Sequence, residues 1–108
     1  MIPNLQSSLI CDDVRQERNG KFMLIGLFDA IQSENFPLNF GKLCLVTRWC
    51  SGEGSFVQRS RIIAPDQKTI LAEGKDVQVN LPSPEASTTS VEVFMNMAFP
   101  TAGTYWVE

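Results

Sequence analysis

The sequence contains no histidine among its 108 residues. Histidine is the commonest general base in proteins, a frequent metal ligand, and a member of the Ser-His-Asp and Cys-His nucleophile systems. Its absence excludes most hydrolytic active sites. We therefore expect a protein that is not an enzyme and that needs no cofactor.

Long apolar segments and disulfide spacings are also lacking. The longest apolar run, Phe22–Phe28, is far shorter than the roughly 20 residues that span a bilayer. Met1–Ser8 has neither the basic side chains nor the continuous hydrophobic stretch of a secretory signal. Cys11, Cys44 and Cys50 are odd in number and have no C-x-x-C spacing. These features predict a cytoplasmic protein with reduced thiols and no membrane partner.

Basic charge is scarce. Nine Lys and Arg residues against twelve Asp and Glu residues give a formal net charge of −3. Because affinity for nucleic acid depends on a basic face that neutralises phosphates, we expect no nucleic-acid partner. The run Gly52-Glu53-Gly54 does not match a phosphate-binding loop, and we interpret it as a hairpin turn.

What is present is an alternation of apolar and polar residues with a period of two, which is typical of half-buried antiparallel strands. The clearest example is Val77–Leu81, whose odd-numbered residues are apolar. Ser90–Ala98 alternates in the same way, with Phe94 on the face opposite Val93 and Met95.

Turn signals such as Asn19-Gly20 divide the chain into about seven strands within one domain, residues 1–108. The expected strands are 5–15, 21–32, 41–51, 55–64, 69–81, 88–98 and 104–108, with a break in the fifth near Gly74. Because Phe22–Phe28 is apolar on both faces, we expect it to be a central strand, and Gly26 indicates a bulge or a close approach within it. In the third strand, Leu43, Leu45 and Trp49 are expected in the core and Arg48 outside it.

Two features favour an immunoglobulin-like arrangement. Ala102–Trp106 resembles a tyrosine corner, in which the hydroxyl of Tyr105 returns to the upstream backbone, and Trp49 stands in mid-chain as in such domains. Val107 stands where the second cysteine would be, so the inter-sheet disulfide is absent. The sequence thus predicts an all-β fold, an antiparallel immunoglobulin-like (Greek-key) β-sandwich; a Greek-key sandwich of other connectivity is the alternative.

The opening of the chain resembles a small bacterial domain family of unknown function. The residues that carry the resemblance are Leu9–Arg15 (L-I-C-D-D-V-R), Asn19–Lys21 (N-G-K) and Leu24–Asp29 (L-I-G-L-F-D), followed by Phe36-Pro37, Gly52–Gly54, Pro65-Asp66, Leu71–Gly74, Phe99-Pro100 and Gly103–Tyr105. The resemblance implies no activity, substrate or catalytic residue. Family members continue for one further hairpin, so we expect either a chain that lacks its C-terminal hairpin or an exposed sheet edge that a second copy covers.

A group of acidic residues is the candidate metal site. Asp12, Asp13 and Asp29 could supply oxygen ligands to Ca²⁺ or Mg²⁺. However, adjacent strand residues point to opposite faces, and basic residues lie close by in the sequence. The alternative interpretation is a charged strand end that pairs across the hairpin, with Lys21 as one partner.

Two further groups admit a functional and a structural interpretation. The three cysteines could form a nucleophile or a metal site, but free cysteine more often packs as a small core residue. Arg48, Arg59 and Arg61 could bind an anionic partner. They could equally form cross-strand ion pairs with acidic residues of neighbouring strands, for which the candidates are Glu53, Glu73 and Glu92.

Apolar residues on outward faces indicate a second buried surface. We expect Phe94 and Val46 to lie there, covered by another subunit or by the chain itself, for which the loop 82–90 is a candidate. The last strand is the other expected contact, through Thr104, Tyr105, Trp106 and Val107. The predicted function is a non-enzymatic protein-interaction or assembly module that uses a sheet edge or face, with itself as a homodimer or with another protein as partner. The alternative is a Ca²⁺- or Mg²⁺-dependent binding domain or enzyme that uses Asp12, Asp13 and Asp29.

Overall fold

The computed structural model describes residues 3–28 and 37–108, and in these residues every regular element is a strand. The strands are β1 (Asn4–Gln16), β2 (Phe22–Leu27), β3 (Leu38–Cys50), β4 (Gly54–Gln58), β5 (Arg61–Ile63), β6 (Ile70–Glu73), β7 (Val77–Leu81), β8 (Ser87–Phe99) and β9 (Trp106–Val107). All pairings are antiparallel, which confirms the predicted all-β class. No helix in the described residues is long and apolar enough to cross a membrane.

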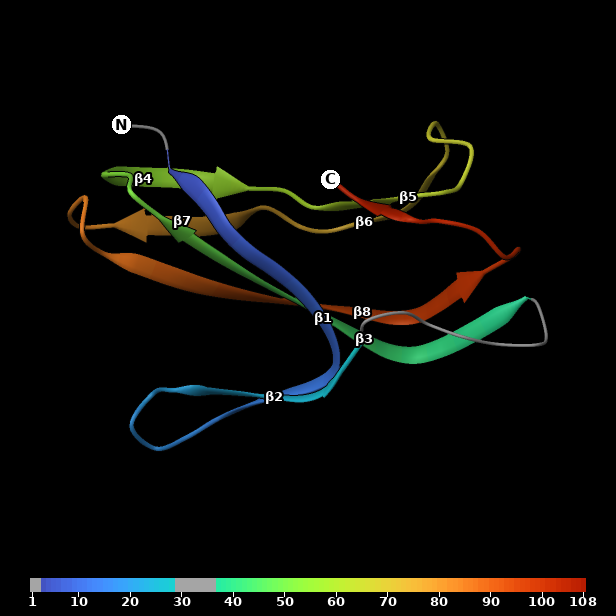
Figure 1. Cartoon of the computed structure of the whole chain (residues 1–108), viewed down its shortest axis with the longest axis horizontal. Coiled ribbons are helices and arrows are strands. Elements are labelled where there is room, and N and C mark those ends of the chain that lie inside the picture. Colours follow the sequence, from blue (N-terminus) through green and yellow to red (C-terminus); the bar gives the residue numbers. More distant parts are fainter. Residues whose placement is uncertain (1–2, 29–36) are drawn as a thin grey trace.

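The largest sheet has four strands in the order β2-β1-β3-β8. Strands β3 and β8 run side by side through the middle of the molecule, and the β1–β2 hairpin lies on one side of them (Figure 1). In this sheet Cys11 lies opposite Cys44, and Cys44 lies opposite Val93. Apolar and polar residues alternate along these strands, since β-branched and apolar residues pack well on a pleated, half-buried surface.

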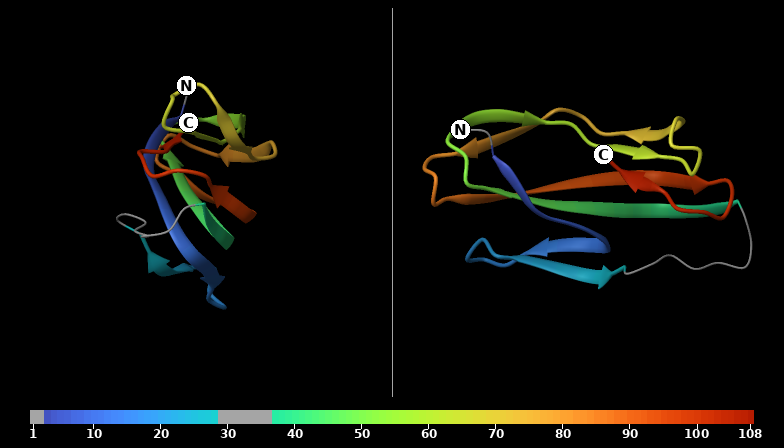
Figure 2. Two further views of the ribbon diagram at one scale, coloured as in Figure 1. Left: turned by 90° about the vertical axis from the view of Figure 1, so that its right-hand side faces the viewer. Right: turned by 45° about the horizontal axis from the view of Figure 1, so that its top comes forward.

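A long two-stranded ribbon lies on the other side of β3 and β8 (Figures 1 and 2). One of its strands consists of β4 and β5, and the other consists of β6 and β7. Both are interrupted at the same level, where the Gly74 amide donates to the Ser60 carbonyl at 2.8 Å. The predicted break near Gly74 is therefore confirmed. Because both strands of the ribbon are interrupted, the structure has more strands than the roughly seven expected from the sequence. Strand β9 adds to the free side of β5.

The main core lies between the four-stranded sheet and the ribbon. Its buried residues are Leu43, Leu45, Ile62, Phe94, Met97 and Phe99. Edge-to-face aromatic contacts extend it, with ring centroids 6.0 Å apart for Phe40–Phe99 and 4.9 Å apart for Phe99–Tyr105. The predicted core positions of Leu43 and Leu45 and the exposure of Arg48 are confirmed, while Trp49 is half-buried.

Several local predictions are confirmed. Asn19-Gly20 forms the turn of the β1–β2 hairpin, where Gly20 has a φ of 93° and the Glu17 amide donates to the Lys21 carbonyl. The hydroxyl of Tyr105 donates to the Thr101 carbonyl at 2.7 Å, as in a tyrosine corner.

Two predictions about strand neighbours are wrong. Within residues 3–28 and 37–108, strand β2 has β1 as its one strand neighbour and is an edge strand, although its apolar sequence suggested a central one. The run Gly52–Gly54 joins β3 to β4, which lie in different sheets, so it is a crossover and not a hairpin turn. Glycine is required at Gly52 because a Cβ atom there would stand 2.8 Å from the backbone of Pro3.

Candidate association surface

The two outer strands of the four-stranded sheet expose apolar side chains and no charged one. Strand β2 has the sequence FMLIGL, and its side chains are mostly exposed, with Leu27 at 53%. Strand β8 exposes Val93 and Met95, the latter at 62%, and its single charged residue, Glu92, is buried. Soluble proteins usually protect edge strands with charges, proline or bulges. The lack of exposed charge therefore distinguishes both of these edges from the edge strands of most soluble proteins.

The β1–β2 hairpin reaches its position through a bend along β1 (Figure 1). Gly26 on β2 has a φ of 69°, and the Asp12 carboxylate lies where a Cβ of residue 26 would stand. This close approach is the one expected at Gly26. Beyond the bend, Val14 and Leu24 pack against the buried cluster of Cys11, Cys44 and Val46. The hairpin thus covers the face of β3 that points away from the ribbon.

Of the predicted contact residues, Val46 and Phe94 are buried within the chain, with 4% and 8% of their surface exposed. Val46 is covered by the β1–β2 hairpin, where we expected a second subunit or the loop 82–90. Phe94 faces the ribbon because the inward set of β8 is Glu92 and Phe94, while Val93 points outward. Neither side chain can therefore form part of an exposed contact surface.

The last strand is the remaining predicted contact. Trp106 and Val107 are exposed and pair with Ile63 and Ile62 of β5. Tyr105 is half-buried against the core, and Thr104 is exposed. Within the described residues the second side of β9 has no strand partner.

The acidic residues do not converge on one point in the described part of the chain. The Asp13 carboxylate accepts a hydrogen bond from Lys42 Nζ at 2.6 Å and lies 3.4 Å from Arg15 Nε. Hydrogen bonds from the Lys42 side chain and from the Val14 amide lower the pKa of Asp13. Asp12 packs on Gly26 instead, and Asp29 lies outside the described residues. Residues 3–28 and 37–108 contain no group of three side chains able to ligate a metal ion.

The arginines are engaged separately. Arg59 Nε lies 2.7 Å from the Asp76 carboxylate across the break in the ribbon, and this hydrogen bond raises the pKa of Arg59. Arg61 pairs with Glu108, and Arg48 donates to the Ser87 hydroxyl at 2.9 Å. Pairing across strands is thus confirmed for Arg59 and Arg61, although their partners are not the glutamates that we expected.

A buried polar network, which the sequence reasoning missed, joins β8 to the ribbon. Glu92 Oε1 accepts hydrogen bonds from Gln58 Nε2 at 2.7 Å and from Ser60 Oγ at 2.6 Å. Gln58 Oε1 in turn accepts from Trp49 Nε1 at 2.7 Å and from Ser90 Oγ at 2.8 Å. No sequence signal pointed to this network, because alternation placed Glu92 on the same, outward face as Phe94. Since all these groups bond one another, the network is structural.

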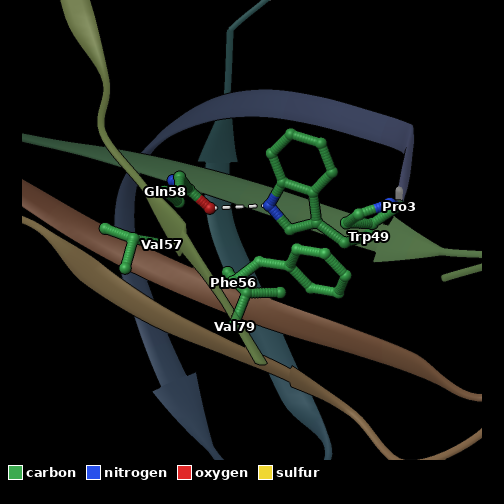
Figure 3. Close-up of a pocket in the computed structure, with 6 residues that line it drawn as sticks. All are labelled: Pro3, Trp49, Phe56, Val57, Gln58 and Val79. Atoms are coloured by element: carbon green, nitrogen blue, oxygen red, sulfur yellow. Dashed lines mark hydrogen bonds between the residues drawn. The ribbon is translucent and has the colours of Figure 1, made fainter. Parts of the chain in front are cut away.

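Trp49 and Gln58 also line a shallow recess, together with Pro3, Phe56, Val57 and Val79 (Figure 3). Its volume is about 50 Å³, whereas pockets for organic ligands measure roughly 300–1,000 Å³. In Figure 3 the Trp49 ring stands beside Phe56, and its Nε1 points to the Gln58 oxygen. The recess is too small for an organic substrate.

The chain matches a known protein family. The model of a protein family described as "Family of unknown function (DUF6941)" matches residues 6–108. No curated protein and no solved structure matches the chain.

Proposed function

The chain belongs to this family of unknown function, and we propose that it is a non-enzymatic protein-interaction module that acts through the edges of its four-stranded sheet. One observation carries the proposal: both outer strands, β2 and β8, expose apolar side chains and no charged side chain. An edge strand has a row of unpaired amide and carbonyl groups, which can pair with a strand of another chain.

The side chains on these edges add a hydrophobic contribution. Met23, Ile25 and Leu27 on β2 and Val93 and Met95 on β8 are each at least two-fifths exposed. Burial of apolar surface is the dominant favourable term in most protein association. Hydrogen bonds along the edge would fix the direction of the partner strand, and these side chains would supply affinity. Strand β9, with Trp106 and Val107 exposed, is a further edge of the same kind.

Two finer features belong to the same proposal. The tyrosine corner at Tyr105 supports an immunoglobulin-like Greek-key sandwich. The three free cysteines support a reducing compartment, which we propose to be the cytoplasm.

Site-specific photo-crosslinking tests the proposal. A photoreactive amino acid is placed at Met23 on β2, at Met95 on β8 and, as a control, at the exposed Lys68 in the Pro65–Thr69 turn, and the cells that express each variant are irradiated. We expect a protein adduct of defined mass from an edge position and none from Lys68. Adducts that are absent at both edges, or equally abundant at Lys68, would contradict the proposal.

A further inference from the structure

We propose that the partner of β2 is β2 of a second copy, paired antiparallel about a twofold axis at Met23. The inference rests on the proposed function, because it names the partner for one of the two uncharged edges. A hydrogen bond 2.8 Å long, from the Glu17 amide to the Lys21 carbonyl, begins the β1–β2 ladder.

That bond determines which backbone groups of β2 face outward. In an antiparallel ladder, directly opposite residues either exchange hydrogen bonds or point their amides and carbonyls away from each other, in strict alternation. Since Lys21 bonds to β1, Met23 does so too, opposite Arg15. The amide and carbonyl groups of Phe22 and Leu24 therefore point to the free edge. Within the described residues no strand other than β1 pairs with β2.

Phe22 and Leu24, which are separated by one residue, can form hydrogen bonds with the same two residues of a second copy. If Phe22 pairs with Leu24 of the second copy, twofold symmetry pairs Leu24 with Phe22 of that copy, and all four amides find carbonyl acceptors. A register centred on Leu24 would instead pair Phe22 with Gly26, whose φ of 69° does not belong to a strand. The register centred on Met23 is therefore the better one.

The side chains are compatible with this register. On one face, Met23 would lie against Met23 of the second copy, and Ile25 would lie opposite its Lys21, so no two like charges would be directly opposed. On the other face, Phe22 and Leu24 would extend the apolar contact that Leu24 makes with the cluster of Cys11, Cys44 and Val46.

A second copy fits β2 better than it fits the other edge. Strand β8 is irregular at Asn96, a non-glycine residue with a φ of 54°, so its free edge is interrupted. Pairing of β2 with β8 of another copy would also be heterologous and would produce rings or open filaments, whereas β2 with β2 closes as a dimer. A pair of six-residue strands buries less than the roughly 1,200 Å² of a standard interface, so we expect a weak, concentration-dependent dimer.

Charge exchange at Met23 tests the register directly. We expect the wild-type mass in multi-angle light scattering to rise from 12.0 kDa toward twice that value between about 10 μM and 1 mM, the range of weak interfaces. Met23→Lys and Met23→Glu should each remain monomeric, because the twofold axis brings like charges together. An equimolar mixture of the two variants should associate again. Met95→Lys on β8 is the matched control and should dimerise like the wild type.

The following results would overturn the inference. A wild type that stays monomeric at 1 mM, or single Met23 variants that dimerise normally, would exclude β2 as the dimer contact. Failure of the mixture to associate would exclude the register at Met23. The proposed function is tested separately. If the wild type is monomeric but still forms a specific crosslink to another protein at Met95 or Met23, the second copy is disproved and the interaction module stands.

Discussion

Cys11 and Cys44 lie directly opposite each other in the β1–β3 ladder, and both are buried, at 0% and 1% exposure. Desolvation by burial raises the pKa of both thiols. The thiol of Cys44 also points toward the backbone carbonyl of Asp12, 3.8 Å away, at the bend of β1. The pair therefore lies beneath the hairpin that covers this face of the sheet.

Thiol labelling should report this burial. We expect iodoacetamide to modify the half-buried Cys50 at least about tenfold faster than Cys11 or Cys44, because thiolate fraction and access both control the rate. Peptide mass spectrometry after timed labelling measures the three rates, and labelling in urea serves as the control in which they should converge. Equal rates in the native protein would contradict the buried position of the pair.

Removal of the buried carboxylate should destabilise the fold. Glu92→Ala leaves the donors of Gln58 and Ser60 without their acceptor, and each unsatisfied buried group costs about 1–3 kcal/mol. We expect the free energy of unfolding in urea to fall by about 2–6 kcal/mol on that basis. Glu85→Ala, at an exposed turn position, is the matched control and should change it by less than about 0.5 kcal/mol.

The break in the ribbon depends on the absence of a side chain at Gly74. A Cβ atom there would collide with the Glu92 carboxylate, so we expect Gly74→Ala to cost about 1–3 kcal/mol of stability. Gly41→Ala is the control, since a Cβ at Gly41 meets nothing within 4 Å. Thermal unfolding of both variants checks this, and equal melting temperatures would show that the break does not need glycine.

The Asp13–Lys42 pair should make stability depend on pH. The folded protein holds the pKa of Asp13 below its ordinary value of 3.8 and that of Lys42 above its ordinary value of 10.5, each chiefly through their mutual hydrogen bond. The aspartate contribution is present above pH 3.8 and is lost as pH falls through the lowered pKa. The lysine contribution is present below pH 10.5 and is lost as pH rises through the raised pKa.

Substitution of the lysine exposes this contribution. We expect Lys42→Met to be less stable than the wild type at neutral pH and equally stable in strong acid, and the pKa of Asp13, followed by NMR, should rise. Lys68→Met is the control, because Lys68 forms no ion pair in the described part of the chain. An unchanged Asp13 titration in Lys42→Met would show that the hydrogen bond does not persist in solution.

Features that depend on neighbouring residues were predictable from the sequence. The Asn19-Gly20 turn, the tyrosine corner at Tyr105 and the break at Gly74 each follow from local backbone preferences, and the structure contains all three. The alternation in β7 likewise buries Val79 and Leu81 and exposes Gln78 and Asn80 between them. Local pattern was thus enough to establish the all-β class.

Features that depend on which strands meet were not predictable. An apolar strand such as β2 has the same composition at a sheet edge as in a sheet centre, so its place could not be read from Phe22–Leu27. The inward set of β8 changes at Asn96, where the left-handed φ lets both Phe94 and Met97 face the core. Alternation alone assigns those two residues to opposite faces, which is why Phe94 was expected outside.

The long β3–β8 ladder has a consequence for folding kinetics. The two strands are neighbours in the sheet, yet the whole ribbon from β4 to β7 lies between them in the chain. Sequence-distant pairings form late, while the β1–β2 hairpin is local and can form early. Until β3 and β8 meet, the early β1–β2 hairpin, with its uncharged strand β2, belongs to a partly folded chain, a state prone to misassembly. We therefore expect refolding yield to fall as protein concentration rises, and to recover when Met23 is replaced by lysine.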